Sequence, residues 1–141
     1  MSKNTVRQLV ETRFLAFDGL DNARKYYANT KEIAAHGQGF WAAIRVEFVS
    51  RKVVSINQNP CTRRYGTIVI DVYGHLGQGT AGISELTDAL EAWFDFYQAD
   101  DLWCGASHTV DAGRAQTHFT GRAQTHFIST VYVPFEYDEH N

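Results

Sequence analysis

Apolar residues recur at helical spacing in two segments of the chain. The first segment predicts a helix from about Val6 to Phe17, with the capping box Thr5-Val6-Arg7-Gln8 at its start and Asp18-Gly19 at its end. The second predicted helix lies in ISELTDALEAWFDFY, and its polar face is acidic. Its apolar stripe consists of Ile83, Leu86, Leu90, Trp93, Phe94 and Tyr97.

Other segments alternate between apolar and polar positions, which is typical of half-buried strands. Strands are predicted in FWAAIRVEFV, which ends at Val49, in YGTIVIDVY, which ends at Tyr73, and in FISTVYVPFEYDE, which ends at Glu139. A shorter strand is expected near Leu102–Cys104. Pro134 has no N–H to donate, so the last strand should lie at an edge or a bulge there.

The predicted order is helix, two strands, helix, and two or three more strands. This order indicates an α+β fold in which two helices pack on one face of a mixed, mostly antiparallel sheet with long hairpin arms. The length of 141 residues fits a single domain spanning residues 1–141. The polar segment 18–39 is predicted to be a long loop containing one helical turn.

Composition excludes several classes of protein. The formal net charge is -3, whereas proteins that grip nucleic acid usually carry a basic excess. No apolar run is long enough for a membrane span, and the first residues have no signal-peptide core. Cys61 and Cys104 lie far apart and outside any CxxC motif, which fits a reduced compartment.

The connection from Ser50 to Arg64 is basic but also holds apolar residues, and we expect it to be a loop that contacts a partner. Its candidate interface residues are Arg51, Lys52, Val53, Val54, Ile56, Arg63 and Arg64. The second helix and the chain end are acidic instead. This asymmetry has two interpretations, ordinary solvated faces or a head-to-tail contact between the basic side of one subunit and the acidic side of the next.

Motifs for catalysis or cofactors are weak in this chain. Gly77–Gly82 reads as GxGxxG between a strand and a helix, but no series of alternating strands and helices follows it, as a dinucleotide fold requires. None of the six histidines shows the spacing of a metal site. We therefore expect no catalytic residues, no metal and no cofactor, and we interpret the glycine motif as a strand-to-helix loop.

The sequence GRAQTHF occurs twice between Gly113 and Ile128, which suggests a tandem duplication of eight residues. We predict a lengthened β-hairpin arm that turns near Thr120-Gly121, so that His118 opposes Ala123 and His126 opposes Ala115. The two histidines then lie on opposite faces, and only a wide loop that pairs His118 with His126 would allow a shared metal. Arg114 and Arg122 become candidate contacts to a neighbouring subunit or to DNA in a channel.

Taken in order, the segments VRQLVETRFLAF, FWAAIRVEFV, RRYGTIVIDVYGHLGQGT, LTDALEAWF and ISTVYVPFEYDE resemble the tail terminator family of long-tailed bacteriophages, the minor tail protein U type. The resemblance implies a structural protein of the virion, assembled in the host cytoplasm and located at the head-proximal end of the tail. It implies a ring of six subunits that sits on the finished tail tube, stops its growth and joins it to the head.

The partners implied by this resemblance are further copies of the chain, the tail tube protein and a head-completion or connector protein, with DNA only as passing cargo. The family has no catalytic residues to carry over. Two other functions stay open. One is a head-completion or neck protein of the same connector region, and the other is a small nucleotide-binding protein that uses the Gly77–Gly82 loop.

Overall fold

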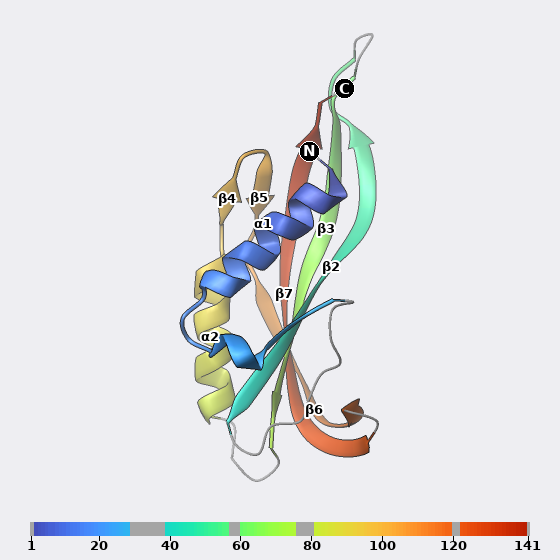
Figure 1. Cartoon of the computed structure of the whole chain (residues 1–141). Helices are drawn as coiled ribbons and strands as arrows, with labels where there is room; N and C mark the ends of the chain where they lie inside the picture. The colour runs from blue at the N-terminus through green and yellow to red at the C-terminus, as the bar shows by residue number, and fades with distance from the viewer. Residues whose placement is uncertain (1, 29–38, 57–59, 76–80, 120–121, 141) are drawn as a thin grey trace.

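Two helices lie against one face of a seven-stranded sheet in the computed structural model (Figure 1). The structure describes residues 2–28, 39–56, 60–75, 81–119 and 122–140, and for 112–119 and 122–126 it describes the backbone only. The helices are α1 (Lys3–Ala16) and α2 (Ala81–Phe94), and a 3-10 turn forms η1 (Asn22–Arg24). The strands are β1 (Lys25–Tyr27), β2 (Phe40–Val53), β3 (Thr62–Gly74), β4 (Gln98–Ala99), β5 (Leu102–Cys104), β6 (His108–Phe119) and β7 (Arg122–Glu139).

The strand order is β1-β2-β3-β7-β5-β4, and β6 pairs with the part of β7 that β5 leaves open. The pairing of β1 with β2 is parallel, and the other pairings are antiparallel. The predicted α+β class and the mixed, mostly antiparallel sheet are therefore confirmed. Figure 1 shows that the β2–β3 and β6–β7 hairpins extend from opposite ends of the sheet, as the predicted arms require.

The main core lies between the helices and the sheet. Alternate residues of β2, β3 and β7 point into it because successive strand residues face opposite sides. These include Ile44, Ile70 and Val131, which are almost fully buried. The α1 side contributes Val6, Val10, Phe14 and Phe17, and the α2 side contributes Ile83, Leu86, Leu90 and Phe94. The helical stripes found in the sequence are thus the faces that hold the fold together.

A smaller cluster lies on the opposite face of the sheet. Trp41, Tyr73 and Ile128 occupy neighbouring positions on β2, β3 and β7, and Tyr26 of β1 joins them. Trp41 is fully buried, and its ring stacks on that of Tyr73 with 6.0 Å between centroids. Both faces of the sheet are therefore apolar at this end, where the β6–β7 arm begins.

Helix α1 begins one turn earlier than predicted. Ser2, not Thr5, is the N-cap, and its side-chain oxygen accepts a hydrogen bond from the Thr5 N–H at 3.2 Å. Both residue types fit an N-cap, so the local pattern alone did not decide between them. The additional turn carries Lys3 over the ring of Phe48, 5.4 Å from its centroid, and Arg7 in the next turn lies 5.0 Å from the same centroid.

Helix α2 ends at Phe94, three residues before the predicted end. Phe96 has a positive φ of 56°, which a helix cannot accommodate. Trp93 and Tyr97 nevertheless keep their predicted role, because Arg13 lies between their rings at 3.9 and 4.4 Å from the two centroids. The indole Nε1 of Trp93 also donates to the Arg13 carbonyl at 2.8 Å, which joins the two helices.

The polar segment after α1 contains the predicted helical turn, η1, but also a strand that the sequence did not reveal. The strand β1 has only three residues and pairs with Ala42–Ile44. Lys25, which is buried at its start, donates to the carbonyls of Leu15 and Phe17 and so satisfies the end of α1. Residues 29–38, the rest of the predicted loop, lie outside the described part.

Pro134 was expected at an edge or a bulge, and the structure corrects this, because β7 is central and pairs with β3 from Phe127 to Glu139. Pro134 lies where the other neighbour of β7 changes from β6 to β5. The N and C=O of a strand residue point to the same side, and the Pro134 carbonyl accepts from the Gly105 N–H at 2.8 Å. The nitrogen of Pro134, which carries no hydrogen, therefore faces the gap between β5 and β6, where no hydrogen bond between strands is lost.

Candidate functional site

The β2–β3 hairpin continues well past the helices and forms an arm at the end of the molecule that also holds both termini (Figure 1). The two strands stay paired as far as Val53 and Thr62. Beyond them, the Val54 N–H donates to the Cys61 carbonyl at 2.9 Å, and the Cys61 N–H donates to the Ser55 hydroxyl at 2.7 Å. The arm is therefore held by hydrogen bonds almost to its end.

This arm corrects the prediction of a loop from Ser50 to Arg64. Residues 50–53 and 62–64 of that segment are strand, and the connection between the strands is confined to residues 54–61, of which 57–59 lie outside the described residues. The strand was missed because most side chains of this part of β2 face solvent. An alternation of apolar and polar residues arises only where one face is buried.

Four apolar side chains are exposed on the arm: Val49 within β2, and Val53, Val54 and Ile56 at its outer end, which we call the apolar tip. Ile56 is as exposed as a side chain can be, at 102%, and Val53 is 62% exposed. The sequence identified three of the four, and Val49 was missed. It lies at a register shift between Phe48 and Ser50 that interrupts the β2–β3 pairing. Exposed apolar residues that gather in one place are typical of a contact surface.

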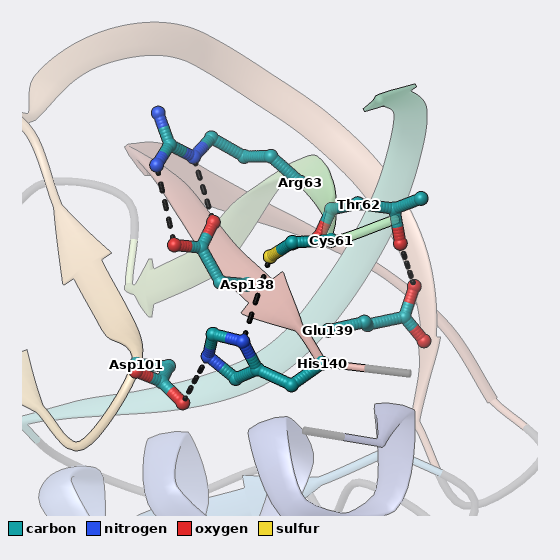
Figure 2. A network of polar contacts seen from close by, with 7 residues as sticks. All are labelled: Cys61, Thr62, Arg63, Asp101, Asp138, Glu139 and His140. Carbon is teal, nitrogen blue, oxygen red and sulfur yellow. Dashed lines mark hydrogen bonds and ion pairs between the residues drawn. The ribbon is translucent and has the colours of Figure 1, made fainter. Parts of the chain in front are cut away.

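The basic residues of the arm have acidic partners in the same chain. Arg63 Nε lies 2.7 Å from Asp138 Oδ1, a contact that Figure 2 shows, and Arg64 Nε lies 2.6 Å from Glu139 Oε1. Arg51 also approaches Glu139, at 3.5 Å. The acidic chain end, which one of the two interpretations placed against a neighbouring subunit, thus already neutralises part of the basic segment within one chain.

These ion pairs change the acidity of the carboxyl groups. The hydrogen bond from Arg63 lowers the pKa of Asp138, and this outweighs the opposing effect of burial. For Glu139, burial acts to raise the pKa, but the hydrogen bond and the charge of Arg64 bring it below its usual value. Both carboxylates are therefore ionised at neutral pH, and Lys52 is left as an exposed cation of the arm.

A shallow groove of about 300 Å³ lies beside the C-terminal half of α1. Its lining residues are Gln8, Glu11, Thr12, Leu15 and Tyr27. Leu15 is half exposed, so the groove presents apolar surface next to the carboxylate of Glu11. The sequence did not predict this groove, because Leu15 falls outside the apolar stripe of α1 and Tyr27 belongs to the unexpected strand β1.

The repeated octad forms the second arm in the predicted register. The first copy lies on β6 and the second on β7, so that His118 is opposite Ala123 and Ala115 is opposite His126. Arg114 and Arg122 occupy positions opposite Phe127 and Phe119, and their side chains lie outside the described part, as does the turn at 120–121. Each copy therefore pairs with the other in antiparallel orientation.

The glycine motif and the metal hypothesis have little support in the described residues. Residues 76–80 lie outside them, and Gly82, in the first turn of α2, packs close to the ring of Phe40. The neighbour of β3 is the antiparallel β7, whereas a dinucleotide fold has adjacent parallel strands. Within the described ranges, no three His, Cys, Asp or Glu side chains could hold a metal, and neither helix could cross a membrane.

No protein-family model matches the sequence, and no curated protein matches it significantly. Several solved protein structures are similar in fold, and one of them carries the comparison. It aligns over 97% of this chain and 96% of its own, with a TM-score of 0.61 and 17% sequence identity. At this identity the likeness shows a shared fold over nearly the whole of both chains.

Proposed function

We propose that this chain is the subunit of a ring, most simply a hexamer, that caps the tail tube of a long-tailed phage and provides the surface for joining the head. The sequence resemblance motivates this proposal. The apolar tip of the β2–β3 arm is the observation that supports it, because an isolated subunit gains nothing from exposing Val53 and Ile56 to water.

The groove beside α1 is the surface that the apolar tip fits best. It is apolar at Leu15 and acidic at Glu11, whereas the tip is apolar and carries Lys52 next to Val53. The two surfaces therefore match in hydrophobicity and in charge. We infer that the tip of one subunit inserts into the groove of the next.

The position of these two surfaces excludes a contact within one chain. The arm lies beyond the N-terminal end of α1, whereas Leu15 lies near the other end of that helix (Figure 1). A tip that cannot reach its own groove must use that of a neighbour. Contacts between two different surfaces generate rings when the rotation closes, and a closed ring is what a tube terminator requires.

The proposal is tested by mixing the protein with polymerising tail tube protein and imaging the products. We expect rings at one end of tubes whose growth has stopped, and a ring mass in solution that depends on concentration. The triple variant V53S/V54S/I56S should remain folded and lose both properties. Val110→Ser, at an exposed valine of β6, is the matched control and should keep them.

Two outcomes would contradict the proposal. If the triple variant forms rings as well as the parent, the apolar tip is not the contact. If the protein binds head connectors and leaves the growth of tubes unchanged, it is a neck or head-completion protein, and the terminator assignment is wrong.

A further inference from the structure

A group of polar side chains lies in the outer part of the β2–β3 arm, next to the apolar tip, because the Cys61 carbonyl accepts from the Val54 N–H. Cys61 directly precedes β3 and His140 directly follows β7, and the pairing of Thr62 with Glu139 brings them opposite each other. The Cys61 Sγ lies 3.6 Å from the His140 Nδ1 (Figure 2). The other ring nitrogen of His140, Nε2, lies 3.3 Å from Asp101 Oδ2 in the turn between β4 and β5.

This arrangement defines the role of each nitrogen. A carboxylate only accepts hydrogen bonds, so Nε2 carries its proton toward Asp101. In the neutral imidazole, Nδ1 then has a lone pair directed at the thiol and can accept the S–H proton. A nucleophile, a base and a carboxylate that orients the base are the elements of an activated cysteine.

The surroundings of the thiol keep it in place and accessible. The backbone of Cys61 is held on both sides, because its carbonyl accepts from Val54 and its N–H donates to Ser55. Its side chain is partly exposed. Two carboxylates, Asp101 and Asp138, interact with His140, and Asp138 is already paired with Arg63. When His140 is protonated, its positive charge therefore lies beside Asp101, a carboxylate that it does not share with Arg63.

The other cysteine provides a contrast within the same chain. Cys104 is buried in β5, and burial raises its pKa to about 12. A thiol in that environment stays protonated and unreactive at neutral pH.

We propose that Cys61 is a nucleophilic thiol that undergoes exchange with small disulfides, with His140 as its base and Asp101 as a positioning residue. In the reaction His140 takes the thiol proton, and the Cys61 sulfur attacks one sulfur of the disulfide. The S–S bond of the reagent breaks, a mixed disulfide forms on Cys61, and the second sulfur leaves as a thiolate that takes the proton from His140. The disulfide is reduced and Cys61 is oxidised, so electrons balance.

Formation of a mixed disulfide on Cys61 would change the contacts of the β2–β3 arm. A group attached to Cys61 would separate the sulfur from His140, so one of the contacts that tie the chain end to the arm would be lost. This site therefore gives the arm a response to oxidising disulfides, which goes beyond the proposed structural role.

The test compares reaction rates of the intact protein with the neutral reagents 2,2′-dithiodipyridine and iodoacetamide from pH 6 to pH 9. A free cysteine is only a few per cent thiolate at pH 7, and we expect Cys61 to react about tenfold faster than a model peptide thiol. Cys61→Ser should abolish the reaction and so identify the site. His140→Gln should reduce the rate to that of the peptide, and Asp101→Asn should move the pH profile.

The matched control is His108→Gln, because His108 stacks on Tyr132 in the sheet and does not contact Cys61. It should react like the parent. Thermal unfolding of each variant shows that the fold is intact. The proposal is overturned if Cys61 in the parent reacts no faster than the peptide, or if His140→Gln leaves the rate unchanged in a folded protein.

Discussion

Arg63 and Asp138 face each other across β3 and β7 and form a two-pronged contact, with Nε 2.7 Å from Oδ1 and Nη2 3.2 Å from Oδ2. The guanidinium also lies over the ring of Trp103, 5.5 Å from its centroid. Most surface ion pairs contribute little, but a planar bidentate contact is the geometry that does contribute. This contact attaches the end of β7 to the outer part of the β2–β3 arm.

The first prediction concerns the pH dependence of this pair. Asp138→Asn should lower the Tm at pH 7, because it removes the partner charge of Arg63. In the folded chain the pKa of Asp138 lies below its ordinary value of 3.8. The pair therefore stabilises the fold above that value, and its contribution is lost as the pH falls through the lower pKa of the folded state.

Thermal unfolding from pH 7 down to pH 2 measures this effect. The difference in Tm between the parent and Asp138→Asn should shrink in acid. Glu47→Gln is the control, since Glu47 contacts Arg45 at 3.3 Å with both side chains about half exposed, and we expect little change at any pH. A Tm difference that persists at pH 2 would show that the pair does not act through its charges.

The second prediction compares two neighbours on α1. Phe14 is fully buried and its ring meets the ring of Tyr27 edge-on, whereas Leu15 is half exposed. Phe14→Ala should reduce the free energy of unfolding by about 3–5 kcal/mol, because it removes core contacts and leaves a cavity. Leu15→Ala should change it by less than about 0.5 kcal/mol. Urea unfolding of both variants is the measurement, and equal losses would contradict the placement of α1.

The third prediction concerns a glycine in β3. A Cβ on Gly66 would lie 2.4 Å from the Glu47 carbonyl oxygen and 2.5 Å from Cζ of Phe135. Gly66→Ala should therefore cost roughly 1–3 kcal/mol, because both the adjacent backbone and the ring must shift. At Gly105 the nearest atom is Cγ of Pro134 at 3.4 Å, so Gly105→Ala should be tolerated. Chemical denaturation measures the free energy of unfolding of both variants. If Gly66→Ala lost no stability, the backbone and the ring around Gly66 would be able to move apart easily.

The parts of the fold that could be predicted are those where one face is buried. The stripe of α2 and the alternation of β3 reflect contact with the core, so Leu90 and Ile70 revealed their roles by spacing alone. The strand β1 could not be found in this way, because three residues are too few to show a period. The outer part of β2 was missed because its side chains from Ser50 to Val53 are solvated.

The candidate site shows the same limit. Val53, Val54 and Ile56 could be identified because apolar residues in a polar segment stand out in the sequence. The partner of Arg63 could not, because Asp138 is 75 positions away and only the register of β3 with β7 brings them together. Cys61 and His140 meet through the same register, and neither carries a local motif.

The last prediction concerns the repeated octad, whose two copies pair with each other on β6 and β7. Deleting Gly113–Thr120 removes four residues from each strand of the arm, or about 13 Å of its length at 3.3 Å per residue. The base of the hairpin, from His108 opposite Tyr132 to Asp111 opposite Ser129, is not touched. Because the copies are identical, Gly121 then takes the place of Gly113 opposite Ile128, and the pairs that remain match those of the parent.

The new turn falls at Gln124-Thr125, which lacks the glycine of Thr120-Gly121, so a second deletion variant with Asn-Gly at these two positions supplies a favourable turn. We expect both deletion variants to unfold within a few degrees of the parent, because a projecting hairpin tip tolerates changes of length. We also expect both to lose ring assembly or the joining of head and tail, because the arm no longer reaches its partner. Calorimetry and electron microscopy measure the two properties separately. If both variants unfold, the octad is part of the structural core. If both assemble normally, the additional length of the arm is not needed for assembly.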